Sequence, residues 1–190
     1  MMDFANFVTR LEAVAARGRI MIHRPDLTPS AVLVPVVERD GAPSLILTRR
    51  TMKVAAHKGE ISFPGGVREP EDRDAVATAL RESREEIGLD PGAVRVLGPL
   101  DDMATTTGFV ITPVLGIVRP DAALAPEPVE VAEVVEAPFA DLMDPARHEL
   151  VTEEFDGASV RYHRYRVAGL DIWGATAWII HRLLVAFEEA

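Results

Sequence analysis

The stretch RESREEIGL, residues 81–89, decides how this chain of 190 residues is interpreted. It closes a helical pattern that runs from Asp74 to Ile87, and Gly88 follows where a helix C-terminal cap belongs. At about 100° per residue, one side of this helix is apolar or small, so it can dock on a sheet. The residues on that side are Val76, Leu80, Ser83 and Ile87.

Three glutamates gather on another side of the same helix. Glu82, Glu85 and Glu86 follow the spacing i, i+3, i+4, which brings their carboxylates within one turn. Like charges at this spacing repel each other unless a cation joins them, and clustered oxygen ligands suit Mg²⁺ or Mn²⁺. The pattern therefore predicts a divalent-metal site. The alternative is a solvated acidic face that Arg81 and Arg84 neutralise.

The loop before this helix adds a second half to the motif. GVREPED at residues 66–72, followed by residues 81–89, resembles the Nudix box: glycine, five residues, glutamate, seven residues, then Arg-Glu-apolar-x-Glu-Glu-x-Gly-apolar. Two positions depart from it. The expected acid falls on Arg73, so Asp72 supplies that carboxylate only if one residue is inserted, and Ser83 stands at a position that is usually apolar.

The resemblance to the Nudix family implies an α/β (α+β) fold, in which a mixed β-sheet is sandwiched between α-helices. No linker divides the sequence, so we expect residues 1–190 to form a single domain of this kind. The resemblance also implies Mg²⁺ or Mn²⁺ as the cofactor. The metal ligands that it implies are Glu82, Glu85, Glu86 and the carbonyl oxygen of Gly66.

The reaction of this family is hydrolysis of a diphosphate linkage, which needs charge neutralisation, an in-line water and a base. The base is expected among the helix glutamates, Glu82 and Glu85 included, or on a nearby loop. Glu130 is the candidate outside the helix, because its surroundings resemble the place where many members add a metal ligand or base. A solvent-facing residue on an alternating strand is the alternative for Glu130. Arg81 would orient a carboxylate through a charge-assisted hydrogen bond.

A longer upstream stretch resembles one branch of the family. LTRRTMKVAAHKGEISFPGG, residues 47–66, is similar to the segment that precedes the box in coenzyme A pyrophosphatases. That branch cleaves coenzyme A or its acyl derivatives into 3′,5′-ADP and 4′-phosphopantetheine. Arg50, Lys53 and Lys58 would contact substrate phosphates, although exposed basic residues at strand ends are common. Ala55 stands where many relatives carry an arginine.

Other functions remain open at this point. ADP-ribose, a dinucleotide or a nucleoside triphosphate would use the same metal site. A different class of protein is a non-catalytic nucleotide-binding regulator on a Nudix fold. A third class is a structural scaffold whose glutamate helix is only a soluble surface. The three intact glutamates argue against the regulator, because a protein that only binds a nucleotide has no physical need for three repelling acids.

The resemblance implies a small-molecule nucleotide as the partner, and composition argues against other partners. The formal net charge of −10 argues against broad nucleic-acid binding, which depends on clustered Lys and Arg. The longest apolar run, Ala31 to Val37, is far shorter than the roughly 20 residues that span a bilayer. With no cysteine and no secretory signal pattern, we expect a cytoplasmic protein without a membrane partner. The resemblance also allows a homodimer.

Hydrophobic periodicity predicts the remaining elements. They are a helix at 3–16, a hairpin of 31–38 and 44–48, strands at 94–97, 109–118, 129–135 and 160–167, and a helix at 173–188. SFPGG, residues 62–66, predicts a sharp loop that cannot continue a central strand. Trp173 is expected to begin the apolar face of the last helix, and Gly174 to allow its close approach to the sheet.

Overall fold

The computed structural model describes residues 3–51, 59–155 and 158–190, which form helices packed around a mixed sheet. The helices are α1 (Phe4–Ala15), α2 (Ala75–Ile87), α3 (Phe139–Leu142) and α4 (Gly174–Glu188), with 3₁₀ turns η1 (Pro91–Ala93) and η2 (Pro145–Arg147). The strands of the large sheet are β1 (Thr28–Arg39), β2 (Ala42–Arg50), β3 (Ile61–Ser62), β4 (Gly65–Val67), β5 (Val94–Pro99), β6 (Met103–Ala104), β7 (Phe109–Val118) and β8 (Val131–Pro138). A small sheet contains β9 (His148–Phe155), β10 (Ala158–Val167) and β11 (Leu170–Ile172).

The long strand β1 organises the large sheet. It runs parallel to β7 along one edge, while its other edge pairs antiparallel first with β4 and then with β2. Pairing with β4 ends at Val32 and pairing with β2 begins at Val36. Pro35 lies between these two pairings, so its missing amide hydrogen interrupts neither ladder. A proline is therefore tolerated in a central strand.

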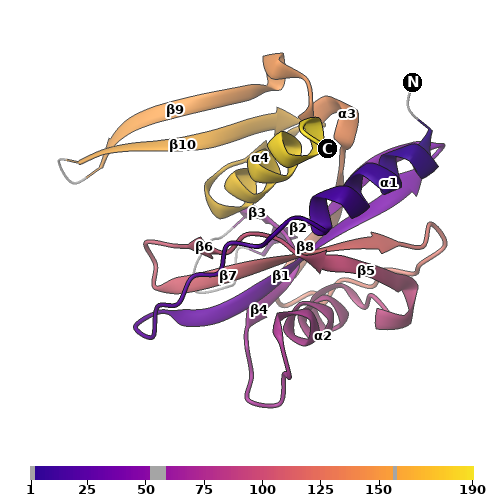
Figure 1. Cartoon of the computed structure of the whole chain (residues 1–190), viewed down its shortest axis with the longest axis horizontal. Helices are drawn as coiled ribbons and strands as arrows, with labels where there is room; N and C mark the ends of the chain where they lie inside the picture. The colour runs from indigo at the N-terminus through magenta and orange to yellow at the C-terminus, as the bar shows by residue number, and fades with distance from the viewer. Residues whose placement is uncertain (1–2, 52–58, 156–157) are drawn as a thin grey trace.

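Helices cover both faces of this sheet. Figure 1 shows α2 on one side, with α1 and α4 on the other. Along β1, Leu33 and Val37 pack on the α2 side, whereas Val34 and Val36 pack on the side of α1 and α4. Because both faces are buried, the strand is a continuous apolar run and not an alternating one. This arrangement confirms the predicted fold of a mixed sheet between α-helices.

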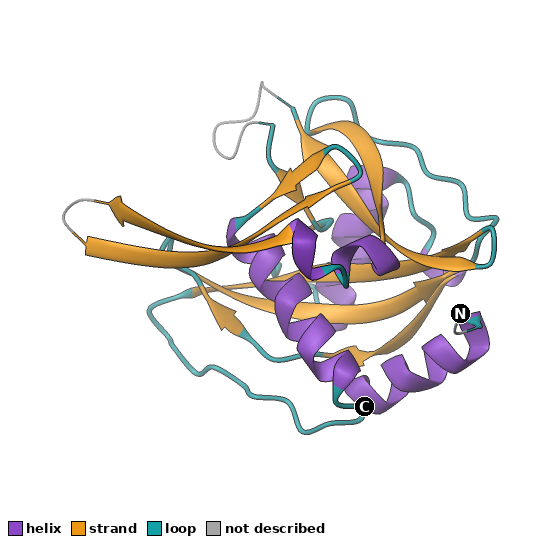
Figure 2. Cartoon of the chain, turned by 90° about the horizontal axis from the view of Figure 1, so that it is seen from above, coloured by secondary structure: helices purple, strands orange, loops and turns teal. Residues whose placement is uncertain are grey.

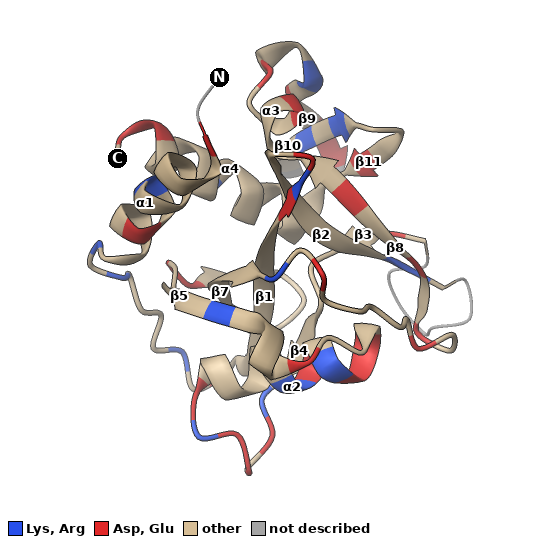
Figure 3. Ribbon diagram, turned by 90° about the vertical axis from the view of Figure 1, so that its right-hand side faces the viewer, with Lys and Arg blue, Asp and Glu red and all other residues tan. Residues whose placement is uncertain are grey.

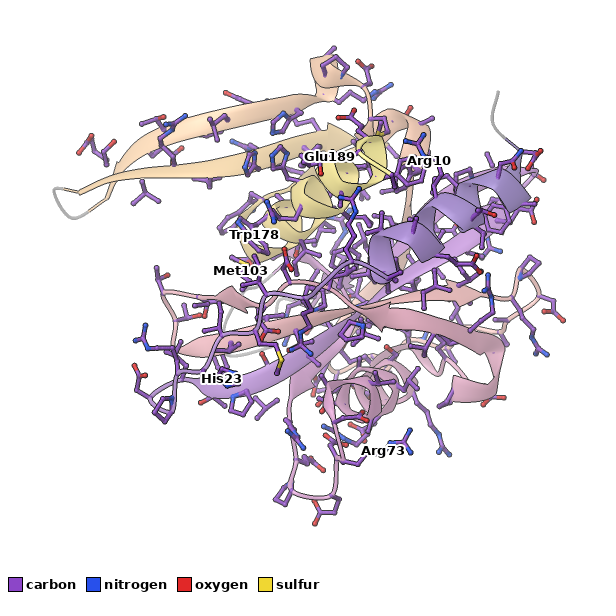
Figure 4. All side chains as sticks on the ribbon, viewed as in Figure 1. Arg10, His23, Arg73, Met103, Trp178 and Glu189 are labelled. Atoms are coloured by element: carbon purple, nitrogen blue, oxygen red, sulfur yellow. The ribbon has the colours of Figure 1, made fainter. Side chains whose placement is uncertain are left out.

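The small sheet lies beside α4, and the β9–β10 hairpin extends well past the rest of the structure (Figure 2). Side chains fill the space between α4, α1 and the large sheet, as Figure 4 shows around Trp178. Among the described residues, no helix combines the length and the apolar composition that crossing a bilayer requires.

Most predicted elements are present, and the differences are local. The helix at α2 has Asp74 as its N-cap and Gly88 as its C-cap, with a φ of 65° at the glycine. The predicted strand 129–135 instead begins at Val131, because residues 128–130 form a turn. Residues 62–66 were expected to form a sharp loop, but Ser62 ends β3, and Gly65 and Gly66 pair with β1 as part of β4. β3, β6, β9, β11 and α3 were not predicted.

Candidate active site

A cleft of about 570 Å³ opens where β3 and β4 meet α2 and the first turn of α4. It gathers residues that are far apart in the sequence onto one concave surface. Figure 3 shows acidic and basic positions side by side on α2, close to β4. The charged and aromatic side chains that line the cleft include Arg50, Glu60, Glu82, Glu86, Phe109, Glu130 and Trp173.

Two glycines let the backbone of β4 approach its neighbours closely. A Cβ atom added at Gly66 would lie 2.5 Å from Cδ of Glu82 and 2.6 Å from both of its carboxylate oxygens. At Gly65, where φ is 158°, an added Cβ would collide with the backbone of Ala31 and Val32. A side chain at Gly65 would therefore separate β4 from β1, whereas a side chain at Gly66 would displace the carboxylate of Glu82.

Glu86 is the most buried acid of the cleft, with 6% of its side chain exposed. Its Oε2 accepts a hydrogen bond of 3.1 Å from the amide of Gly65, and Nη1 of Arg50 lies 3.6 Å from its Oε1. Burial raises the pKa of Glu86 to about 7, and the charges of Glu82 and Glu130 act in the same direction. The pKa of Glu82 is also raised, mainly by burial. The cleft thus holds two acids whose charged forms are disfavoured mainly by burial.

Arg81 connects the loop before α2 to the helix acids. Its Nη2 donates to the carbonyl of Val67 at 2.9 Å and to Asp72 at 3.0 Å, while its Nη1 lies 2.9 Å from Glu82 and 3.0 Å from Glu85. The guanidinium therefore holds three carboxylates at once, and this geometry agrees with the orienting role expected for it.

Asp72 is buried and accepts hydrogen bonds from Arg81 and from the amide of Glu69. The Arg81 guanidinium lowers the pKa of Asp72 to about 2, so the carboxylate stays charged. The extra residue between Asp72 and Arg81 does not prevent this pairing. Asp72 lies under Arg81 and is absent from the lining of the cleft, which makes it a support for the loop.

The three helix glutamates differ in their surroundings and in their exposure. Glu82 and Glu86 line the cleft, whereas the side chain of Glu85 is 58% exposed, pairs with Arg81 and is not part of the lining. Glu130 lines the cleft from the turn before β8, where its carbonyl accepts a hydrogen bond from the amide of Thr51. Glu130 is therefore not on an alternating strand, although it is exposed.

Of the three predicted phosphate contacts, the structure places only Arg50. Its side chain is 25% exposed and lines the cleft, and its buried Nε has no hydrogen-bond partner among the described residues. Lys53 and Lys58 lie outside the described residues, as does Ala55.

The family follows from comparison with known proteins. Residues 27–158 match the NUDIX domain. The chain belongs to the Nudix family. It is 36% identical over 180 residues to an uncharacterized Nudix hydrolase NudL of Escherichia coli K12, covering 94% of this chain and 91% of that one. The NudL of Photorhabdus laumondii is 36% identical over 154 residues, covering 81% and 82%.

Solved structures support the same fold. A Nudix hydrolase from M. smegmatis, RenU, superposes with a TM-score of 0.52 at 20% identity, covering 60% of this chain and 72% of that one. The protein is thus a Nudix hydrolase, and hydrolases of this family generally use divalent cations.

The residues of this Nudix hydrolase fit a hard divalent cation. Glu82 and Glu86 supply clustered carboxylate oxygens, and Gly66 brings its backbone against Glu82 without an intervening side chain. Oxygen donors suit Mg²⁺ and Mn²⁺. A bound cation would stabilise the charged forms of both acids, which burial disfavours.

Two residues that line the cleft of the Nudix hydrolase were not predicted from its sequence. Trp173 was expected to pack against the core, but it is 44% exposed and lines the cleft. That expectation was wrong because Trp173 precedes α4 as its N-cap, and Gly174, the first residue of the helix, turns the chain with a φ of 63°. No atom lies within 4 Å of a Cβ added at this glycine. Glu60 also lines the cleft, and nothing in the spacing of the motif singles it out.

Proposed function

We propose that this Nudix hydrolase cleaves the diphosphate linkage of coenzyme A or acyl-coenzyme A, giving 3′,5′-ADP and 4′-phosphopantetheine or its acyl derivative. At the coarser level it is a pyrophosphatase of nucleoside diphosphate derivatives. The observation that carries the proposal is the cleft itself, where carboxylates, a guanidinium and an indole share one surface. These groups match the three parts of such a substrate: a diphosphate that a cation would neutralise, a further phosphate and an aromatic base.

The cation would be Mg²⁺ or Mn²⁺, and Glu82, Glu85, Glu86 and the carbonyl of Gly66 would hold it. When bound, it supplies neutralisation of the diphosphate charge, which otherwise repels a nucleophile. Arg81 would keep Glu82 and Glu85 oriented through the contacts described above. Because Glu85 is exposed and bound to Arg81, we assign it to the outer edge of the metal site.

Hydrolysis consumes one water, whose oxygen bonds to one phosphorus while the bridging P–O bond breaks. A carboxylate must take the proton of that water. We assign this role to Glu130, because it lines the same cleft as Glu82 and Glu86 and is not held in an ion pair among the described residues. Arg50 would bind a phosphate oxygen through its guanidinium.

The preference for coenzyme A rests on residues 47–66, which resemble the segment of coenzyme A pyrophosphatases. Coenzyme A carries a 3′-phosphate besides its diphosphate, and Lys53 and Lys58 are proposed as its contacts. Trp173 offers an exposed aromatic face on which the adenine could stack. We place the enzyme in the cytoplasm, with a small-molecule nucleotide as its partner.

The test is a substrate panel. The purified chain is incubated with Mg²⁺ or Mn²⁺ and equal concentrations of coenzyme A, acetyl-coenzyme A, ADP-ribose, a dinucleotide and a nucleoside triphosphate, and the products are identified by mass spectrometry. We expect 3′,5′-ADP and phosphopantetheine to form fastest. Turnover of ADP-ribose with coenzyme A left intact would contradict the substrate assignment while leaving the diphosphate chemistry in place.

A further inference from the structure

Three of the five histidines of the chain meet outside the catalytic cleft. His148 begins β9, His163 lies on β10 and His181 lies on α4, and all three are half-buried. One ring nitrogen from each can be chosen so that the three nitrogens lie within 4.8 Å of one another. Figure 1 and Figure 2 both show β10 against α4, where this histidine cluster, defined as His148, His163 and His181, joins the small sheet to the helix.

The contacts inside the histidine cluster are those of imidazoles without a counter-ion. Nε2 of His148 lies 2.9 Å from Nδ1 of His163, and the rings of His163 and His181 stack with centroids 3.7 Å apart. Among the described residues, no carboxylate hydrogen-bonds to any of the three rings. Nδ1 of His181 instead lies 3.2 Å from the hydroxyl of Tyr165, which is almost fully buried.

We propose that His148, His163 and His181 form a binding site for a nitrogen-preferring divalent transition-metal ion such as Zn²⁺, separate from the oxygen-lined catalytic cleft. Imidazole is a preferred ligand of Zn²⁺, with Zn–N distances of about 2.0–2.1 Å. Tetrahedral coordination at that distance separates the nitrogens by about 3.3 Å, which lies between the 2.9 Å of the closest pair and the 4.8 Å limit of the cluster.

Rotation of the imidazole rings would bring the cluster to that arrangement. The rings are nearly parallel, so their lone pairs must turn toward a common point by rotation about χ2, which is a broad and soft torsion in histidine. The Tyr165 hydroxyl can fix the orientation of the His181 ring, as outer partners of metal-binding histidines commonly do. Three protein ligands leave a fourth position for water or a small anion.

Protons compete only weakly with a metal ion for the imidazole nitrogens of this cluster. Burial, together with the neighbouring imidazoles of His181 and His148, lowers the pKa of His163 to about 4. A neutral imidazole has a lone pair free for a metal. The ion would tie β9 and β10 to α4, the helix whose first turn lines the catalytic cleft. The site would therefore stabilise the wall of the cleft that carries Trp173.

The test uses the full-length, untagged chain after removal of metals with a chelator. Zn²⁺ alone is titrated by calorimetry, and Co²⁺ is titrated as a spectroscopic probe whose visible absorption reports nitrogen coordination. We expect one tight Zn²⁺ per chain. His163→Ala and, independently, His181→Ala should weaken it by at least about 10²-fold, since even loss of an outer partner costs 10–100-fold.

Two controls separate this site from others. His23→Ala removes an exposed histidine outside the cluster and should leave Zn²⁺ affinity unchanged. Glu86→Gln alters the catalytic cleft and should leave the tight Zn²⁺ in place. The proposal is overturned if folded His163→Ala and His181→Ala variants bind Zn²⁺ like the wild type. It is equally overturned if Glu86→Gln abolishes Zn²⁺ binding while either histidine variant retains it.

Discussion

Replacement of Gly66 by alanine tests how closely the cleft is built. The new Cβ would lie 2.5 Å from Cδ of Glu82, and ordinary contact begins near 3.4 Å, so the carboxylate must retreat by about 0.9 Å. A misplacement of about 1 Å can cost about 10²-fold in rate, which corresponds to about 2.7 kcal/mol of transition-state stabilisation. We therefore expect kcat/KM of Gly66→Ala to fall about 10²-fold, with weaker Mn²⁺ binding.

The fold should tolerate this change. Gly66 does not have a positive φ, and the atoms that the methyl group meets belong to the end of a flexible side chain, so we expect a loss of only about 1 kcal/mol in the free energy of unfolding. Gly18→Ala is the matched control, because no atom lies within 4 Å of its added Cβ and its φ is not positive. Kinetics, Mn²⁺ titration and urea unfolding are measured on both. A folded Gly66→Ala protein with wild-type kcat/KM would refute the reasoning.

Three further predictions concern the surroundings of the cleft. Asp72→Asn should lower the free energy of unfolding by about 1.5–3 kcal/mol at neutral pH, as expected for loss of a hydrogen bond between charged groups. The pKa of Asp72 is about 2 in the folded protein and ordinarily 3.8. The difference in the free energy of unfolding between Asp72→Asn and wild type should therefore be complete above pH 5 and should shrink as the pH falls toward 2. A difference that stays constant in acid contradicts this prediction. Trp173→Ala should raise KM for coenzyme A about tenfold with kcat nearly unchanged, whereas Trp173→Phe keeps most of the stacking; steady-state kinetics that show a fall in kcat alone would refute it. Arg50→Ala should lower kcat/KM by at least about tenfold, but Arg49→Ala should not, because Arg49 pairs with Glu133 and does not line the cleft; equal losses in the two variants would exclude a specific contact at Arg50.

The long strands of the large sheet could be predicted because they carry strong signals, whereas the two- and three-residue strands β3, β4 and β6 are too short to do so. The run from Ala31 to Val37 is apolar on both faces since helices cover both sides of β1. The small sheet was harder to predict. β9 has the sequence HELVTEEF, whose polar residues give no clear alternation, and it is a strand because β10 pairs with it. With four residues, α3 is too short to show a helical period.

The candidate site was also predicted only in part, because residue spacing is visible in the sequence whereas burial depends on tertiary packing. Spacing along α2 grouped Glu82, Glu85 and Glu86 correctly on neighbouring positions, but it could not show that Glu86 would be buried against Gly65 while Glu85 stayed exposed. That difference depends on how the helix docks under β4. Trp173 was missed for a similar reason, because the turn at Gly174 and not the helical period sets its direction.

Metal-dependent diphosphate hydrolysis at the acids of α2 requires Glu86, so turnover by Glu86→Gln is the decisive measurement. The matched control is Glu71→Gln, which removes an exposed acid of the loop before the helix. Product formation from coenzyme A is followed with Mg²⁺ or Mn²⁺ for the wild type and both variants, with thermal unfolding as the check on folding. We predict that Glu86→Gln loses at least about 10²-fold in kcat while Glu71→Gln matches the wild type. A folded Glu86→Gln enzyme with wild-type turnover would contradict the account.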